Sequence, residues 1–215
     1  MTLKKTMTYK IKEIFLTLQG EGFNAGKAAI FCRFSGCNLW SGMEKNRKKS
    51  ICTFCDTDFV GIDGINGGNY KLKQLIKKIE KIGKKIDSNK FIVFTGGEPL
   101  LQLDTDLIKE LKKNNYIIAI ETNGTIIPPE GVDWICVSPK VGAKTILNYG
   151  HEIKIVYPQT GLRLKAYEKL NFKYFYLQPM YDKDYESNIK ETLEYILKNP
   201  QWKLSLQTHK YLGIK

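Results

Sequence analysis

The 215-residue sequence has no long apolar run. A membrane-spanning helix needs roughly 20 consecutive apolar residues, and no stretch approaches that length. The first seven residues, Met1-Thr-Leu-Lys-Lys-Thr-Met, are too few and too polar for a secretory signal peptide. We therefore expect a cytoplasmic protein that has no membrane partner.

Arginine is scarce. Only Arg33, Arg47 and Arg163 are arginines among 34 basic residues, so the formal net charge of +12 rests on lysine. Nucleic-acid-binding proteins rely on the arginine fork for base and phosphate contacts, whereas dispersed lysine is typical of a solvated surface. Lysines cluster at residues 45–49 and 77–85. We expect no direct nucleic-acid binding; a basic rim that docks an acidic protein and a tRNA-binding face are the alternatives.

The cysteines are few and odd in number: Cys32, Cys37, Cys52, Cys55 and Cys136. An odd count without an export signal disfavours a disulfide framework, which leaves metal ligation or burial. Cys32 and Cys136 fall inside predicted strands, where we expect small buried hydrophobic residues.

The hydrophobic share of 42% and the aromatic share of 12% indicate a folded protein, which we expect to be one domain spanning residues 1–215. Apolar patterns predict strands at residues 10–17, 28–34, 91–95, 117–121, 134–138, 152–156, 174–178 and 203–206. Helical periodicity predicts helices at residues 72–84, 104–114, 162–170 and 186–198.

This alternation predicts an α/β fold with a parallel sheet. A closed eight-unit barrel needs about 250 residues, so we expect an incomplete parallel (β/α) barrel. In such folds the chemistry lies at the carboxyl ends of the strands. The segments that follow four predicted strands begin at Thr95, Glu121, Ser138 and Gln178, and all are polar or glycine-rich.

Three cysteines have the spacing Cys-x14-Cys-x2-Cys: Cys37, Cys52 and Cys55. A structural zinc site uses four ligands, one more than these three cysteines provide. Three thiolates with one free corner suit a 4Fe–4S cluster that keeps one iron open. The spacing alone leaves both sites open.

Gly96-Gly97-Glu98-Pro99 follows a predicted buried strand. The two glycines allow the backbone to approach a ligand closely, and Glu98 can accept a hydrogen bond from an ammonium group. An ordinary strand–helix turn with a helix beginning near Pro99 is the alternative.

The cysteine triad followed by Gly-Gly-Glu-Pro resembles the radical S-adenosylmethionine superfamily. Within it, eight segments in chain order are similar to a lyase family that contracts the ring of 6-carboxy-5,6,7,8-tetrahydropterin to a carboxylated 7-deazaguanine and ammonia, on the route to queuosine in tRNA. The segments are Leu18-Gln-Gly-Glu-Gly, Cys37-Asn-Leu, Cys52-Thr-Phe-Cys-Asp-Thr, Thr95-Gly-Gly-Glu-Pro, Glu121-Thr-Asn-Gly, Ser138-Pro-Lys, Gln178-Pro-Met and Gln207-Thr-His-Lys.

The resemblance implies three cofactors and a set of site residues. Cys37, Cys52 and Cys55 would hold a 4Fe–4S cluster, and Thr57 would bind Mg²⁺. S-adenosylmethionine would contact Phe54, Cys55, Asp56, Gly97, Glu98, Ser138, Pro139, Lys140, Gln178, Pro179, Met180 and Tyr181. The pterin would contact Leu18, Gln19, Gly20, Glu21, Arg33, Thr95, His209 and Lys215.

The resemblance also implies a homodimer and an electron donor of the flavodoxin or ferredoxin type. Most of the superfamily has Cys-x3-Cys-x2-Cys, whereas here residues 38–51 form a basic insertion; members of the lyase family with the longer gap exist. The alternatives are an activase for a glycyl-radical enzyme, and a non-enzymatic zinc or cluster module. We expect His151 to be a loop residue.

Overall fold

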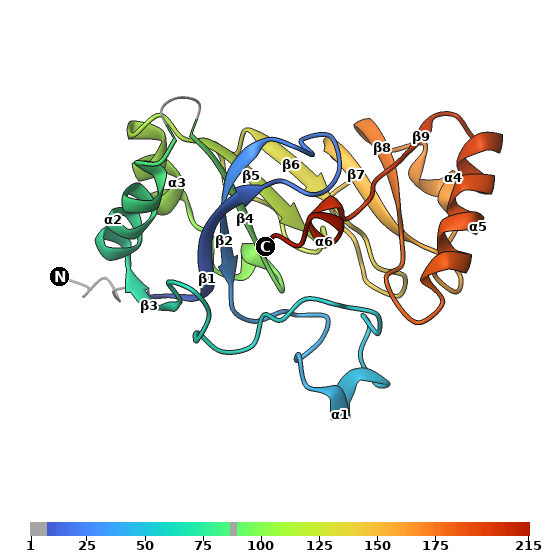
Figure 1. Ribbon diagram of the computed structural model, residues 1–215, viewed down its shortest axis with the longest axis horizontal. Helices are drawn as coiled ribbons and strands as arrows, with labels where there is room; N and C mark the ends of the chain where they lie inside the picture. Colours follow the sequence, from blue (N-terminus) through green and yellow to red (C-terminus); the bar gives the residue numbers. More distant parts are fainter. Residues whose placement is uncertain (1–7, 87–89) are drawn as a thin grey trace.

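The computed structural model describes residues 8–86 and 90–215, and its centre is one open sheet (Figure 1). The strands are β1 (Thr8–Leu18), β2 (Ala28–Phe34), β3 (Gly68–Lys71), β4 (Phe91–Gly96), β5 (Ile117–Thr122), β6 (Trp134–Val137), β7 (Tyr149–Tyr157), β8 (Asn171–Pro179) and β9 (Trp202–Leu204). Their order in the sheet is β3-β1-β2-β4-β5-β6-β7-β8-β9. Neighbours from β2 to β9 are parallel. The expected incomplete barrel is confirmed.

The first strand departs from the parallel arrangement. β1 pairs antiparallel with both β2 and β3. Only nine residues, 19–27, join β1 to β2, and a connection this short without a helix suits antiparallel neighbours. The purely parallel expectation is therefore wrong for this edge of the sheet.

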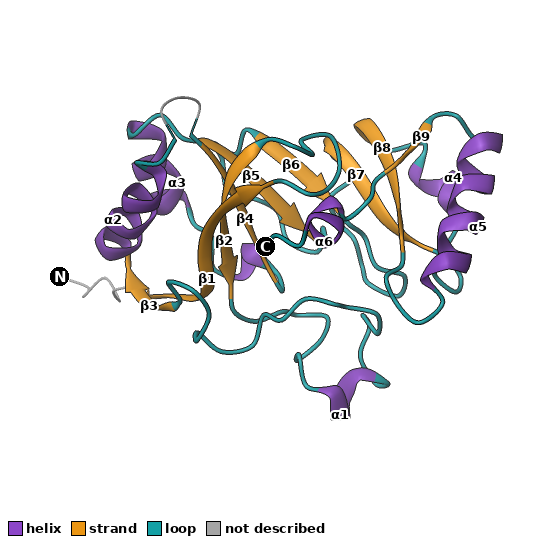
Figure 2. Ribbon diagram, in the orientation of Figure 1, coloured by secondary structure: helices purple, strands orange, loops and turns teal. Residues whose placement is uncertain are grey.

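The helices are α1 (Glu44–Arg47), α2 (Leu72–Gly83), η1 (Pro99–Leu101), α3 (Thr105–Lys113), α4 (Leu164–Tyr167), α5 (Tyr185–Lys198) and α6 (Thr208–Leu212). Helices α2, α3 and α5 pack against strands of the sheet, whereas α1 projects away from it (Figure 2). In α2, Leu75, Ile76 and Ile79 are buried, as the helical periodicity predicts. No helix among the described residues is long and apolar enough to cross a membrane.

Several boundaries differ from the sequence expectation. The helix expected at residues 162–170 is reduced to the single turn of α4, and β8 follows from Asn171, which pairs with Tyr149 of β7. The polar strand β3 has no apolar pattern; its pairing with residues 8–11 of β1 defines it. Cys32 and Cys136 are buried at 0% and 1% exposure, as expected.

His151 is not a loop residue, contrary to expectation. It lies in β7, its Nδ1 accepts a hydrogen bond from the backbone N–H of Ile135, and its ring stacks on Trp134. Residues 1–7, on which the absence of a signal peptide was argued, lie outside the described residues. The single domain at residues 1–215 stays a prediction, since it includes them.

Candidate active site

Two adjoining cavities open at the carboxyl ends of the parallel strands. We call them the arginine cavity, of about 550 Å³ and lined by Arg33, and the cysteine cavity, of about 170 Å³ and lined by Cys37, Cys52 and Cys55. Six residues line both: Glu21, Asp56, Thr57, Thr95, Glu121 and Gln207. A molecule in one cavity therefore lies next to a molecule in the other.

The three cysteines belong to a small apolar cluster of their own. Cys52 packs with buried Leu39, Trp40 and Phe59, and Cys37 and Cys55 pack against this group. A hydrogen bond with the Cys52 thiol lowers the pKa of Cys55 to about 6, despite its burial. Burial raises the pKa of Cys37, and the hydrogen bond with Cys55 raises that of Cys52. The thiolate is the form that binds metal, so Cys55 is the thiol of the three that is most readily deprotonated for ligation. Among residues 8–86 and 90–215, no three His, Cys, Asp or Glu side chains are placed to hold one metal ion.

The Gly96-Gly97 turn packs directly on the loop of the first cysteine. A Cβ atom added at Gly97 would lie 2.3 Å from the carbonyl oxygen of Gly36 and 2.6 Å from the Cβ of Cys37. The backbone N–H of Glu98 donates to the same Gly36 carbonyl at 2.9 Å. Glycine is therefore required at position 97 because this loop passes so close to it.

Glu98 lies behind the wall of the cysteine cavity. Its side chain is buried at 0% exposure and accepts hydrogen bonds from Leu100 N at 3.0 Å, Thr122 Oγ1 at 2.8 Å and Asn123 N at 2.8 Å. These bonds tie the end of β4 to the end of β5. The contact of Glu98 with an ammonium group stays a prediction.

Most of the residues expected around S-adenosylmethionine line the cysteine cavity. They are Phe54, Cys55, Asp56, Gly97, Ser138, Lys140, Gln178, Pro179, Met180 and Tyr181. Pro139, like Glu98, is not among the lining residues. The Lys140 ammonium donates to the carbonyl and hydroxyl oxygens of Ser138 at 2.6 and 2.7 Å, and burial lowers its pKa.

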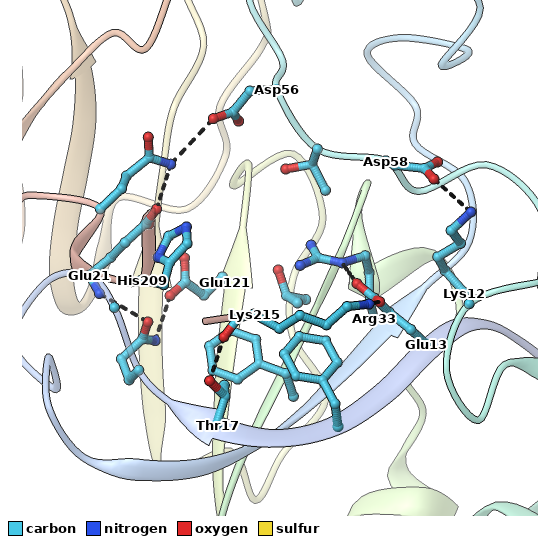
Figure 3. Close-up of a pocket in the computed structure, with 18 of the residues that line it drawn as sticks. Lys12, Glu13, Thr17, Glu21, Arg33, Asp56, Asp58, Glu121, His209 and Lys215 are labelled. Atoms are coloured by element: carbon cyan, nitrogen blue, oxygen red, sulfur yellow. Dashed lines mark hydrogen bonds and ion pairs between the residues drawn. The ribbon is translucent and has the colours of Figure 1, made fainter. Parts of the chain in front are cut away.

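All eight residues expected around the pterin line the arginine cavity, and Figure 3 shows part of this set. The Nε of Arg33 donates to Glu13 at 3.0 Å. Lys215 also pairs with Glu13, and the Thr17 hydroxyl donates to a Lys215 oxygen. The His209 ring lies against Gly20, where an added Cβ would be 2.2 Å from its Nδ1.

A buried charge network lies opposite Arg33 (Figure 3). The Lys154 ammonium pairs with both Glu21 and Glu121, and its side chain is only 4% exposed. Gln207 donates to Glu21 at 2.9 Å, and Gln19 donates to Glu121 at 2.9 Å. Burial alone would raise the pKa of Glu21, but the attraction of Lys154 and the hydrogen bonds from Lys154 and Gln207 lower it to about 2. Glu21 is therefore held as a carboxylate.

Sequence reasoning missed Glu121, Lys154 and Gln207 as site residues. Glu121 and Gln207 begin segments that the resemblance uses, so a signal was present. For Lys154 the signal was the position of two charged residues in an otherwise apolar strand. Glu152 and Lys154 are two residues apart, so both side chains point to the same face of the sheet.

Comparison with known proteins assigns the class. Residues 46–199 match the Radical SAM superfamily. The chain therefore belongs to the radical S-adenosylmethionine superfamily, which implies a 4Fe–4S cluster and S-adenosylmethionine. A protein of Caulobacter vibrioides named 7-carboxy-7-deazaguanine synthase is 54% identical over 209 residues, which cover 97% of this chain and 100% of that one.

More distant relatives support the same family assignment. A 7-carboxy-7-deazaguanine synthase of Haemophilus influenzae is 33% identical, over 96% of this chain and 94% of its own. The crystal structure of QueE from Escherichia coli matches with a TM-score of 0.69 and 25% identity, over 93% of this chain and 94% of that one. Within the superfamily, the chain belongs to the 7-carboxy-7-deazaguanine synthase family. The resemblance read from the sequence is confirmed, and the protein is an enzyme.

Proposed function

We propose that the protein converts 6-carboxy-5,6,7,8-tetrahydropterin to 7-carboxy-7-deazaguanine and ammonia. The observation that carries this proposal is the bipolar shape of the arginine cavity. Figure 3 shows Glu21, Glu121 and His209 on one side, and Arg33 with Glu13 on the other. Phe15 and Phe31, stacked with ring centroids 5.7 Å apart, line the same cavity. A flat ring with a hydrogen-bond-donating edge at one end and a carboxylate at the other is complementary to this arrangement.

The acidic end suits the pterin's guanidine-like edge. This edge presents N–H donors, and a carboxylate accepts them in pairs. Glu21 and Glu121 are the acceptors here, with backbone groups of residues 18–20 beside them. The amides of Gln19 and Gln207 hold the two carboxylates in place. His209, whose pKa burial lowers, would contact the substrate as a neutral ring.

The basic end suits the substrate carboxylate. Arg33 uses its Nε for Glu13. Within the described part of the chain its two terminal nitrogens form no hydrogen bond, so they can fork to a carboxylate. Thr95 lies between the two cavities and lines both. We assign to it a contact with the substrate at the side that faces S-adenosylmethionine.

The cysteine cavity would hold both cofactors of the family. Cys37, Cys52 and Cys55 would bind the cluster, and the residues from Ser138 to Lys140 and from Gln178 to Tyr181 would position S-adenosylmethionine. When bound, the cluster would supply the one electron needed for reductive cleavage of S-adenosylmethionine. The six residues shared by the two cavities would hold the substrate next to S-adenosylmethionine and exclude water.

Thr57 would bind a Mg²⁺ ion at the junction of the cavities. It lines both of them, and its hydroxyl is the hard oxygen ligand that Mg²⁺ prefers.

We also propose a homodimer, which light scattering of the purified protein tests directly. A monomer at all concentrations would contradict that proposal.

Anaerobic turnover tests the function. The reconstituted protein is incubated with S-adenosylmethionine, a chemical reductant, Mg²⁺ and carboxytetrahydropterin, and the products are identified by mass spectrometry. We expect the ring-contracted acid and ammonia in equal amounts. A cluster that cleaves S-adenosylmethionine but gives no ring-contracted product would refute the proposal. The Cys37→Ala variant is the control for non-enzymatic conversion.

A further inference from the structure

The Lys210 side chain joins two segments that are far apart in the sequence. Its ammonium donates to the Asp56 carboxylate at 2.6 Å, and the same nitrogen lies 3.3 Å from the centre of the Tyr181 ring. Asp56 directly follows Cys55 and lines both cavities. Tyr181 comes just after β8 and lines the cysteine cavity. One cation therefore links the segment after the last cysteine to the segment after β8.

Helix α6, which carries this lysine, also contacts the Gly20-Glu21 segment. The backbone N–H and the hydroxyl of Thr208 both donate to the Gly20 carbonyl oxygen, at 3.0 and 2.9 Å. Gln207, directly before the helix, donates to Glu21 at 2.9 Å. Figure 3 shows the His209 ring next to Glu21 at this end of the arginine cavity. Helix α6 therefore lies between the groups proposed for the two ligands.

Polar contacts rather than a core hold α6 in place. None of its five residues, all of which the structure describes, is buried. Tyr211 and Leu212 are each 61% exposed, and the Tyr211 hydroxyl forms a hydrogen bond with the Tyr185 hydroxyl of α5 at 2.8 Å. A short helix without a buried face has little stability of its own. Ligands that add or strengthen contacts can therefore order it.

We propose that Lys210 is a positioning residue that couples the binding of S-adenosylmethionine to the binding of the pterin. The inference rests on the proposed function, in which S-adenosylmethionine contacts Asp56 and Tyr181. When the cofactor fixes these two side chains, it also fixes Lys210 and, through it, α6. The ordered helix then holds Gly20 and Glu21 in position for the pterin. Coupling between two ligands is reciprocal, so the pterin tightens the binding of S-adenosylmethionine by the same factor.

Direct contact with the pterin is the other role that the position of Lys210 allows, because this residue lines the arginine cavity. A direct contact would contribute to pterin affinity whether or not S-adenosylmethionine is bound. A coupling role instead leaves the affinity for the pterin alone nearly unchanged and removes the gain that the cofactor brings. Measuring each ligand with and without the other separates the two roles.

The test measures the dissociation constants of S-adenosylmethionine and carboxytetrahydropterin anaerobically on cluster-loaded protein. The cluster is kept oxidised, so S-adenosylmethionine stays intact. We expect each ligand to tighten the other about fivefold or more in the unmodified protein. Lys210→Met should lose most of this factor. Gln207 keeps a hydrogen bond to Asp56 at 3.3 Å, so a small part should remain.

Lys203→Met is the matched control. Lys203 is exposed, lines neither cavity, and has its Nζ 5.7 Å from the centre of the Tyr174 ring. Its replacement removes the same charge close to α6 and should leave the coupling unchanged. Lys210→Arg keeps the cation and should keep the coupling. Asp56→Asn should add little to the loss of coupling in Lys210→Met, because both changes break the same ion pair.

Hydrogen exchange of residues 208–212 gives a readout that needs no pterin. S-adenosylmethionine alone should slow the exchange of these amides in the unmodified protein and in Lys203→Met, but not in Lys210→Met. Slowing in all three proteins, or in none, would contradict the proposal.

Three results of the binding experiment would also overturn it: no coupling in the unmodified protein, full coupling in Lys210→Met, or equal losses in Lys210→Met and Lys203→Met. A loss of pterin affinity that does not depend on S-adenosylmethionine would assign a direct contact instead. If both ligands bind but no ring-contracted product forms, the proposed function fails while the coupling still decides the role of Lys210. If the pterin does not bind, hydrogen exchange decides it.

Discussion

The Lys154 ammonium lies 2.7 Å from the Glu121 carboxylate, and the lysine side chain in this ion pair is only 4% exposed. The same ammonium binds Glu21, which is 133 residues away in sequence. One cation therefore holds two carboxylates that line both cavities, and it keeps them from repelling each other. Lys154 is a positioning residue for the substrate end formed by Glu21 and Glu121.

Replacing Lys154 with methionine should destabilise the protein strongly. Removing one partner from a buried ion pair leaves uncompensated charge and costs about 3–5 kcal/mol. The free energy of unfolding in urea measures this loss. Lys112→Met is the control, because Lys112 pairs with Asp133 at 36% exposure and such pairs contribute about 1 kcal/mol or less. Equal losses in the two variants would contradict the assigned role. Adding Glu121→Gln to Lys154→Met should restore part of the loss.

Because of the Glu21 carboxylate, the free energy of unfolding should fall at acidic pH. The pKa of Glu21 in the folded protein, about 2, lies below the ordinary glutamate value of 4.5, so the unfolded chain takes up a proton first as the pH falls. The contribution of Glu21 to the free energy of unfolding is therefore complete above about pH 4.5 and is lost as the pH falls toward 2. Urea unfolding at several acidic pH values should show a shallower pH slope for Glu21→Gln. Glu110→Gln, on the surface of α3, is the control. An unchanged slope for Glu21→Gln would disprove the assignment.

Arg33→Gln should weaken substrate binding. Charge-assisted hydrogen bonds to a carboxylate contribute about 1.5–3 kcal/mol, so KM should rise about tenfold to a hundredfold while kcat changes less. The KM of Arg33→Lys should lie between those of the unmodified protein and Arg33→Gln, since lysine keeps the positive charge but cannot form the two-pronged hydrogen bond of a guanidinium. Glu13 keeps Lys215 as a partner, so the fold should tolerate both variants. Exposed Arg163→Gln is the control. A tetrahydropterin without the carboxylate should bind all variants equally.

Gly97→Ala should impair assembly of the cluster. An added methyl group would overlap the Gly36 carbonyl and the Cβ of Cys37, so the first cysteine would be displaced. Iron and sulfide content after reconstitution measures the effect, and circular dichroism checks the fold. Gly213→Asn is the control and should be tolerated. No atom lies within 4 Å of a Cβ added at Gly213, and asparagine accepts the φ of +62° at this position. Full cluster content in Gly97→Ala would rule out this role.

Thr57→Val should abolish the response of turnover to Mg²⁺, because valine keeps the shape but removes the oxygen ligand. Thr57→Ser should retain it. Turnover is measured across a Mg²⁺ titration, with cluster content as the check on assembly. If Thr57→Val responds to Mg²⁺ as the unmodified protein does, the ion binds elsewhere.

Local patterns identified most of the residues that line the two cavities. The three cysteines, the glycine pair and the residues after each parallel strand were recognisable because strand ends meet at one edge of such a sheet. The eight residues expected around the pterin line one cavity, and their contacts with the substrate stay predictions. The position of Glu98 was not predictable, because its burial depends on donors from η1 and from the end of β5 together.

The sequence by itself determined the class of fold, the cysteine triad and the family, because apolar periodicity and short motifs are local properties of the chain. The tertiary structure alone decided that β1 runs antiparallel and that Lys154 joins two distant carboxylates. These features depend on which segments share one buried volume. Burial strengthens charge interactions, so a lysine that looks ordinary in the sequence becomes the centre of the site.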